Sequence, residues 1–347
     1  MARMPGNNRS TPKPRRFTQS GETMVTRHFN PQLAVVTGAG SGIGRGTARA
    51  LASRGIVLVI ADINFEAAQD VAREIRDNGG HAFPYHLDVA DTFALEKFAI
   101  DVKNTHGVPD VVVNNAGILV GGPLVDVPLA DLQRIIDINL MAMVHGCRVF
   151  GSQMTERGTG GHLVNIASMA AFAAAPYTGP YSVSKYAVKH FSECIRAELA
   201  PFGIGVTAVC PGLIATNLST TMKADGLLDA GQAELARRLM LKGQALFGMH
   251  PDKAGRIIVR AIEKNRAIQP IRIEAHLSYP LARYFPGLVR ALMTQLGKRD
   301  IQALRDRVAS PQTIDRTARL IERVPFRGNY GVDSADGSLN TTINGAR

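Results

Sequence analysis

Short Val- and Ile-rich runs alternate with longer helical patterns along most of this 347-residue chain. The runs are apolar at consecutive positions, which is typical of strands buried on both faces. Because strand and helix alternate, we expect an α/β fold with a doubly wound, parallel, seven-stranded sheet and helices on both faces. The expected strands are 33–37, 56–61, 82–87, 110–115, 162–168, 205–210 and 267–273, and the expected helices are 42–54, 64–78, 91–106, 128–157, 178–201 and 251–265.

The two ends of the chain differ in composition from its centre. The first residues are rich in Pro, Gly, Ser, Asn and Arg and lack hydrophobic periodicity, which predicts disorder. Beyond the α/β domain we expect one or two helices broken near Pro280 and Pro286. The expected organisation is a disordered basic extension at 1–30, a Rossmann-type domain at 31–275, a basic helical extension at 276–327 and a disordered tail at 328–347.

The formal net charge of +11 is concentrated at the two ends. Residues 1–28 carry +5 and residues 253–330 carry +10, whereas residues 29–252 carry −3. Basic ends could bind nucleic acid or an anionic membrane, or could simply be solvated surface. No nucleic-acid motif and no alternation of aromatic with basic residues is visible, so we expect no nucleic-acid partner.

One stretch of the basic extension is amphipathic. Its apolar side could lie on a membrane surface, or it could pack against the body of the protein or a partner subunit. The apolar stripe consists of Leu288, Val289, Leu292, Met293 and Leu296, flanked by Arg290, Lys298 and Arg299.

The sequence lacks the marks of an exported or membrane-spanning protein. No run approaches the ~18 apolar residues of a membrane-spanning helix, and the N-terminus has no apolar segment like that of a secretory signal. Cys147, Cys194 and Cys210 are scattered, with neither a disulfide framework nor metal-ligand spacing. We therefore expect a cytoplasmic protein without a metal site, at most peripherally associated with a membrane.

The segment VVTGAGSGIGRG, residues 35–46, follows the first expected strand and begins the first expected helix. Its glycines let backbone N–H groups approach a phosphate, and the helix N-terminus adds partial positive charge, which indicates a dinucleotide site. Asp62 ends the second strand, where it can accept a hydrogen bond from an adenosine ribose and would repel a 2′-phosphate. Because no basic residue stands at position 41 or 63, the sequence favours NAD over NADP, although Asp62 could instead cap the helix at 64–78.

Three tyrosines lie close together in residues 174–191, but only Tyr181 has a lysine four residues later. Tyr181 and Lys185 share one face of a helix. A free tyrosine has a pKa of about 10, and an ammonium ~4 Å away would supply about 4 kcal/mol at a dielectric constant of ~20, enough to bring that pKa to ~7. The pair suits a general acid and base, whereas Tyr177 and Tyr186 are interpreted as packing or pocket-wall residues.

These motifs and their order resemble the short-chain dehydrogenase/reductase family, over roughly residues 32–275. The spacings T-G-x-x-x-G-x-G and Y-x-x-x-K resemble its shorter branch rather than its longer, epimerase-type branch. The matching segments are TGAGSGIG (37–44), LDVAD (87–91), NNAG (114–117), Asn139 in DINLMAMV, Ser168 standing 13 residues before Tyr181, YSVSK (181–185) and PGLIAT (211–216).

The resemblance implies reversible hydride transfer between a nicotinamide and a carbinol or carbonyl carbon. Tyr181 would be the acid and base, Lys185 would support it and hold the nicotinamide ribose, Ser168 would polarise the substrate oxygen and Asn139 would anchor a water that relays the proton. The expected cofactor contacts are Gly38, Ser41, Gly42, Ile43, Gly44, Asp62, Asp88, Val89, Asn115, Ala116, Gly117, Tyr181, Lys185, Pro211, Gly212, Ile214 and Thr216.

The segments expected to surround the substrate, 117–124, 168–179 and 213–250, are small, apolar and dotted with methionine. No Arg or Lys stands between 117 and 133 or between 158 and 184, so an anionic substrate would find little to bind. We expect a lipophilic alcohol, ketone or aldehyde, and a lid formed by 213–250.

The resemblance also implies a homodimer or homotetramer built through the helices at 128–157 and 178–201. Two other functions are compatible with the motifs: a non-catalytic, cofactor-binding regulator, and a lyase or epimerase on the same fold. Regulators of that kind usually lack the Tyr–Lys pair, so the complete Asn–Ser–Tyr–Lys set favours the oxidoreductase.

Overall fold

The computed structural model describes residues 30–173, 175–216, 218, 244 and 247–308. Nearly all of the expected extension at 1–30, most of the expected lid at 213–250 and the expected tail at 328–347 lie outside these residues.

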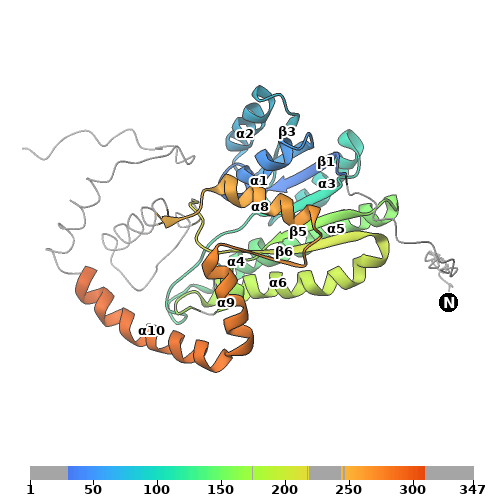
Figure 1. Ribbon diagram of the computed structural model, residues 1–347. Coiled ribbons are helices and arrows are strands. Elements are labelled where there is room, and N and C mark those ends of the chain that lie inside the picture. Colours follow the sequence, from blue (N-terminus) through green and yellow to red (C-terminus); the bar gives the residue numbers. More distant parts are fainter. Residues whose placement is uncertain (1–29, 174, 217, 219–243, 245–246, 309–347) are drawn as a thin grey trace, which may run out of the picture. The chain divides into compact units, whose positions relative to one another are not determined.

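The expected parallel sheet is confirmed. Its strands are β1 (Leu33–Thr37), β2 (Val57–Asp62), β3 (Ala82–His86), β4 (Val111–Asn114), β5 (Gly161–Ile166), β6 (Ile204–Pro211) and β7 (Ile268–Ile271). They form one seven-stranded sheet with the order β3-β2-β1-β4-β5-β6-β7, and every neighbouring pair is parallel (Figure 1). The chain starts at β1, builds outward to β3 and then crosses to the other side of β1, so its direction of travel reverses between β1 and β4. Such a reversal opens a crevice at the carboxyl ends of the strands.

Helices cover both faces of this sheet, which is why its central strands are apolar at consecutive positions. The helices are α1 (Gly42–Ala52), α2 (Phe65–Asp77), α3 (Thr92–His106), α5 (Ala142–Arg157), α6 (Gly179–Leu199) and α8 (Pro251–Glu263), with short 3₁₀ helices at Met169–Ala171 and Ala200–Phe202. On one face, α1, α2 and α8 share a core with Val36 of β1. On the other face, α3, α5 and α6 share a core with Val35 of β1 and the fully buried ring of Phe150.

The single helix expected at 128–157 is interrupted. It consists of α4 (Leu129–Ile136), a π-helical turn at Asp137–Met141, and α5. Within this stretch the N–H of Ala142 donates to the carbonyl of Asp137, five residues earlier, instead of the residue four back. Such widened turns usually occur at functional sites, and Asn139 lies in the middle of this one.

The C-terminal helices break in one of the two places expected. α9 (Ile273–Tyr284) continues through Pro280, and α10 (Pro286–Val308) begins after a break at Phe285. A helix can absorb one proline by losing one hydrogen bond, whereas Pro286 stands at the start of a helix, where its missing N–H costs nothing. The expected domain boundary between residues 275 and 276 falls inside α9.

α9 and α10 pack on the segment that precedes α6. The ring of Tyr279 lies 4.8 Å from that of Phe172, and Tyr177 donates a 3.4 Å hydrogen bond to the carbonyl of Gly297. Val289 is buried, whereas Leu288 and Leu292 beside it are exposed. No helix among the described residues is long and apolar enough to cross a membrane.

Candidate active site

A cavity of about 490 Å³ lies where the strands end. Its walls come from the segments that follow β1 to β6, as expected at a reversal point of the sheet. Of the expected cofactor contacts, all except Gly44 line it, and so does Ser168. The full lining is Gly38, Ser41, Gly42, Ile43, Asp62, Ile63, Leu87, Asp88, Val89, Asn115, Ala116, Gly117, Ile118, Leu119, Arg134, Ile138, Ile166, Ala167, Ser168, Tyr181, Lys185, Pro211, Gly212, Leu213, Ile214, Thr216, Leu218 and Gln244.

The glycine loop is shaped for close backbone approach. Gly38 has a φ of +59°, and a Cβ there would lie 2.8 Å from the Cα of Ala116. Ser41 precedes α1 without a side-chain capping bond, so the first-turn N–H groups face the cavity without a cap from that residue. This cradle fits the pyrophosphate of a dinucleotide, because a helix N-terminus attracts anions.

Thr37 joins the glycine loop to the loop after β4. Its hydroxyl accepts hydrogen bonds from the backbone N–H groups of Asn115 (3.1 Å) and Ala116 (3.3 Å). The Asn115 side chain donates in return to the carbonyls of Thr37 and Gly38, each at 2.9 Å. Thr37 is a positioning residue that the sequence analysis did not assign, because its partners stand more than seventy positions away.

Asp62 supports the glycine loop from the end of β2. One carboxylate oxygen accepts from the N–H of Gly40 at 2.8 Å, and the other accepts from the N–H of Asn64 at 2.9 Å. The cap of α2 is Asn64, whose side chain accepts from the N–H of Ala67. The alternative interpretation of Asp62 as the helix cap is therefore wrong, and its carboxylate lines the cavity instead.

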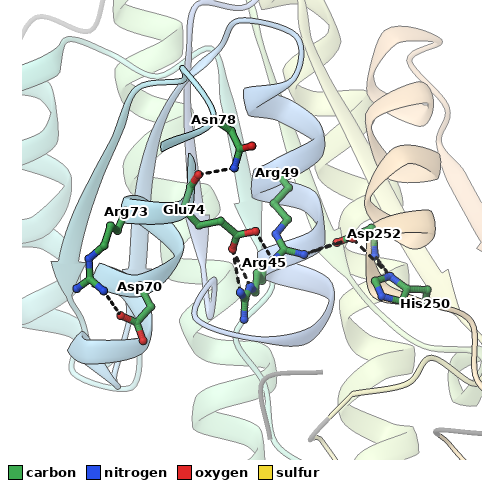
Figure 2. Close-up of polar contacts among 8 residues, drawn as sticks. All are labelled: Arg45, Arg49, Asp70, Arg73, Glu74, Asn78, His250 and Asp252. Carbon is green, nitrogen blue, oxygen red and sulfur yellow. Dashed lines mark hydrogen bonds and ion pairs between the residues drawn. The ribbon is translucent and has the colours of Figure 1, made fainter. Parts of the chain in front are cut away.

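A charged cluster joins α1 to α2 and α8 (Figure 2). Arg45 and Arg49 of α1 both pair with Glu74 of α2, and Arg49 also lies 3.1 Å from Asp252 of α8. Burial raises the pKa of Glu74, but its bonds to Arg49 and Arg45 outweigh this and leave the pKa below its usual range. The cluster ties α1 to the neighbouring helices α2 and α8.

Tyr181 and Lys185 enter the cavity from the first turns of α6. Both are buried, and the Lys185 Nζ lies 5.9 Å from the centroid of the Tyr181 ring. Lys185 donates a 2.9 Å hydrogen bond to the carbonyl of Ile166, at the end of β5. Ser168 stands two residues beyond β5, and its hydroxyl accepts from the N–H of Ala170 at 3.2 Å.

The pKa values of this pair move toward the uncharged forms. Burial raises the pKa of Tyr181, and hydrogen bonding to Ser168 opposes this only in part. Burial also lowers the pKa of Lys185 to about 8, with Cys210 acting in the opposite direction. The sequence had led us to expect a lowered phenol pKa. That expectation counted the attraction between charges and left out the cost of removing a phenolate from water.

Asn139 does not line the cavity but braces it. Its side chain accepts from the N–H of Ile118 (2.8 Å) and donates to the carbonyl of Ile118 (3.0 Å) and to the hydroxyl of Ser184 (3.1 Å). Ser184 in turn donates to the carbonyl of Tyr181 at 2.7 Å. Ser184, which the sequence analysis also missed, thus links the π-helical turn to the first turn of α6.

Gly117 leaves room for the side chains of Asn139 and Lys185. A Cβ at Gly117 would lie 3.1 Å from the Asn139 Oδ1 and 3.3 Å from the Lys185 Nζ. The last residue of the NNAG motif therefore has a steric reason to be glycine, beyond its place in a turn.

The other two tyrosines of the segment do not line the cavity. Tyr177 bonds to Gly297 of α10 with a φ of +63°, and Tyr186 is exposed beside the ring of His190. Neither is placed to exchange a proton in the cavity.

The remaining wall of the cavity is largely apolar, with Ile118, Leu119, Leu213 and Leu218 among its residues. It also contains Arg134 of α4, an exposed cation. Arg134 stands one position beyond the stretch 117–133 that lacks Arg and Lys, so it was not predicted as part of the wall.

Comparisons with known proteins place the chain in a family. A sequence model of the family described as short chain dehydrogenase matches residues 32–226. EphD of Mycobacterium tuberculosis (strain H37Rv), described as a probable oxidoreductase, is 45% identical over 266 residues, which cover 76% of this chain and 45% of EphD. The chain thus spans less than half the length of that relative.

Two further matches extend over nearly the whole of the other protein. SadH of the same strain, also named as an oxidoreductase, is 33% identical over 259 residues, covering 74% of this chain and 91% of SadH. The crystal structure of a short chain dehydrogenase/reductase from Burkholderia phymatum in complex with NAD has a TM-score of 0.66 at 26% identity, covering 76% of this chain and 93% of that one. The chain therefore belongs to the short-chain dehydrogenase/reductase family of oxidoreductases.

Proposed function

We propose that this protein transfers hydride reversibly between NAD and a lipophilic alcohol, ketone or aldehyde, with Tyr181 as the general acid and base. The observation that carries the proposal is one cavity shared by two sets of groups. A glycine cradle and Asp62 lie on the side of β1 and β2, and Ser168, Tyr181 and Lys185 lie on the side of β5 and α6.

The residues of the chain would move the proton. Tyr181 would accept it from the substrate hydroxyl in oxidation and return it in reduction, while the Ser168 hydroxyl holds the substrate oxygen. Lys185 favours the phenolate while it is charged, and Asn139 with Ser184 keeps α6 in register with the loop after β4. The nicotinamide, when bound, supplies the hydride acceptor or donor.

Asp62 supports a preference for NAD. Its carboxylate is fixed by two backbone N–H groups, so it cannot swing away from the cavity without leaving them unpaired. A ribose hydroxyl could donate to this carboxylate, whereas a 2′-phosphate would meet like charge. Asp88 and Val89 would flank the adenine, and the segment 211–216 would border the nicotinamide.

The apolar wall around Ile118, Leu119, Leu213 and Leu218 supports a lipophilic substrate. Burying the hydrocarbon surface of a substrate against this wall would stabilise the complex. Ser168 and Tyr181 would fix the position of the substrate's single oxygen.

The decisive experiment is NADH-linked oxidation of hydrophobic primary and secondary alcohols by the wild type and by Tyr181→Phe, with Tyr186→Phe as the matched control. We expect activity in the wild type and in Tyr186→Phe, and a loss of several orders of magnitude in Tyr181→Phe. Equal activity in all three would overturn the mechanism, and a preference for NADP would overturn the role of Asp62. Conversion of an alcohol substrate without net NADH formation would instead indicate a lyase or epimerase.

We also propose that α9 and α10 contact an anionic membrane. The support is a set of exposed apolar side chains on both helices, together with the exposed cations Arg283 and Arg290. The exposed apolar residues are Ile273, Leu277, Leu281, Tyr284, Phe285, Leu288, Leu292 and Leu296.

Co-sedimentation with vesicles tests this contact. We expect binding to phosphatidylglycerol vesicles, weaker binding to phosphatidylcholine, and loss of binding in Leu288→Ser/Leu292→Ser. The double variant Leu124→Ser/Val125→Ser, which removes exposed apolar side chains outside α9 and α10, serves as control. A wild type that stays in the supernatant with anionic vesicles would overturn the proposal.

For assembly, we propose a homodimer or homotetramer through α5 and α6. Val183 and Tyr186 of α6 and Met141 just before α5 are exposed apolar residues, which supports a contact there. Light scattering of Val183→Glu against the wild type tests it, and an unchanged mass would count against this surface.

A further inference from the structure

Arg272 has a backbone conformation that side chains rarely adopt. It is the residue between β7 and α9, with φ of +77° and ψ of +161°. This region is essentially restricted to glycine, because a Cβ there crowds the neighbouring backbone. Such a conformation persists only where surrounding contacts hold the residue in place, and in Arg272 the contacts are made by the side chain.

The Arg272 guanidinium joins two segments that are far apart in the sequence. Its Nη1 donates to the carbonyl of Leu213 at 2.9 Å and to the carbonyl of Phe247 at 2.6 Å. Its Nε lies 3.1 Å from the Oε1 of Glu274. That same carboxylate oxygen accepts a 2.9 Å hydrogen bond from the N–H of Leu213. Arg272 and Glu274 therefore hold both backbone groups of Leu213.

Leu213 belongs to the cavity wall, so this pair acts on the site. Gly212, beside it, donates to the carbonyl of Ile271 at 2.9 Å, and a Cβ at Gly212 would lie 2.5 Å from the Glu274 Oε1. The carboxylate thus sits directly against the backbone of the wall. A side chain at position 212 would therefore collide with Glu274, near the start of α9.

A short parallel bridge completes the junction. Ala215 donates to the carbonyl of Met249, and Met249 donates to the carbonyl of Leu213, both at 3.0 Å. The Leu213 carbonyl consequently receives two donors, Arg272 and Met249. Segments 213–215 and 247–249 are tied to each other and to the end of β7.

We propose that Arg272 and Glu274 are positioning residues that fix the wall at 211–216 and, with it, Leu213 of the proposed substrate wall. The strained backbone of Arg272 is retained because it aims one guanidinium at two carbonyls and one carboxylate together. This inference rests on the proposed function for the meaning of the cavity, but the contacts themselves do not depend on it. A merely structural pair would change unfolding without changing how substrate binds.

Two variants separate these possibilities. Arg272→Gly removes the guanidinium and relieves the backbone strain, so its melting temperature should stay near that of the wild type while the wall loosens. Glu274→Gln keeps an acceptor for Leu213 but removes the negative charge that holds Arg272. The matched control is Arg54→Ala, which breaks an ion pair with Glu263 of similar length, 2.8 Å, outside the cavity.

The first measurement is amide hydrogen exchange at Leu213, Ala215 and Met249. We expect their protection to fall in Arg272→Gly and to stay unchanged in Arg54→Ala. The second measurement is steady-state kinetics, where kcat/KM for the alcohol should fall about tenfold or more in Arg272→Gly, mainly through KM, because small displacements of a positioned group are costly. Arg272→Lys keeps the positive charge but replaces the planar guanidinium with a single ammonium, so its kcat/KM should lie between those of Arg272→Gly and the wild type.

The results can contradict the positioning role and the proposed function independently of each other. Unchanged protection in Arg272→Gly, or lost protection with unchanged kcat/KM, would overturn the positioning role. If the wild type oxidises no alcohol, the proposed function fails, and the exchange measurement still decides whether this pair fixes the wall.

Discussion

The ammonium nitrogen of Lys185 lies 5.9 Å from the centre of the Tyr181 ring. Both side chains are buried, and burial pushes the pKa of each toward its neutral form. The lysine is held there by the carbonyl of Ile166 rather than by a carboxylate. Among the described residues no carboxylate pairs with Lys185, so its charge remains able to stabilise a phenolate.

The first prediction concerns pH. Because burial raises the pKa of Tyr181, alcohol oxidation, which requires the phenolate, should accelerate as the pH rises toward that pKa, and carbonyl reduction should show the opposite trend. Lys185→Met should move the rise in oxidation to higher pH. Lys189→Met is the control, because Lys189 pairs with Glu193 at 2.7 Å and does not line the cavity. An oxidation rate independent of pH would contradict the role of Tyr181.

The second prediction concerns Gly117. In Gly117→Ala the new methyl group would meet the Asn139 Oδ1 at 3.1 Å and the Lys185 Nζ at 3.3 Å, so one of them must shift. We expect kcat to fall about tenfold, since misplaced catalytic groups are costly, with little change in the melting temperature. Gly179→Ala, at the start of α6, meets nothing within 4 Å and should keep full activity. Equal kcat values in the two variants would show that the close approach at Gly117 is unimportant.

The third prediction concerns acid stability. Burial, with a contribution from Arg196, lowers the pKa of His162 to about 3. Thr207 uses its own proton to bond to the carbonyl of Arg266, so it accepts from the His162 Nε2 at 2.8 Å. An unfolded histidine titrates near pH 6.5. Between about pH 6.5 and about pH 3, His162 therefore binds a proton in the unfolded chain but not in the folded protein. The free energy of unfolding consequently falls as the pH falls through this range.

At pH 5 this single group should reduce the free energy of unfolding by about 2 kcal/mol relative to pH 7. The melting temperature of His162→Gln should therefore fall less on acidification than that of the wild type, although at pH 7 it is the lower of the two. His81→Gln, at an exposed histidine, is the control and should behave like the wild type. If His162→Gln and the wild type lose the same melting temperature, His162 does not set the acid sensitivity.

The fourth prediction separates the tyrosines. Tyr177→Phe removes the hydrogen bond to Gly297 and should lower the free energy of unfolding by about 1 kcal/mol. Tyr177→Phe should leave kcat unchanged. The control is Tyr186→Phe, at an exposed tyrosine, which should change neither kcat nor the free energy of unfolding. Thermal unfolding and NADH-linked assays measure both effects, and a large loss of kcat in Tyr177→Phe would place that phenol in the chemistry.

Much of the fold could be predicted because its signals are local. The apolar runs that became β1, β4 and β6 are buried on both faces by the alternating helices, and the glycine loop follows β1 directly. Asp62 could be located in the same way, since it ends a strand whose length the sequence indicates. What the sequence could not show were contacts set by the pairing of distant elements.

Thr37, Ser184 and Arg272 illustrate that limit. The bonds of Thr37 exist only because β1 pairs with β4, and those of Ser184 exist only because the π-helical turn packs on α6. Arg272 joins backbone groups more than twenty and nearly sixty residues away, and nothing in its neighbourhood signals a positive φ. The direction of the Tyr181 pKa was missed for a related reason, because burial belongs to the folded protein and not to the spacing of two residues.

The widened turn at Asp137–Met141 has a consequence for how this chain can vary in length. A π-helical turn closes its hydrogen bond over five residues where an α-helix uses four, so it holds one extra residue without rotating the helix that follows. Removing one residue from this turn would restore regular winding and leave Cys147, Phe150 and Met154 of α5 in the core that they now fill. The deletion would instead move Asn139 and break its bonds to Ile118 and Ser184. A one-residue deletion here should therefore preserve the fold and damage the site, whereas the same deletion in the middle of α5 would rotate core side chains by about 100°.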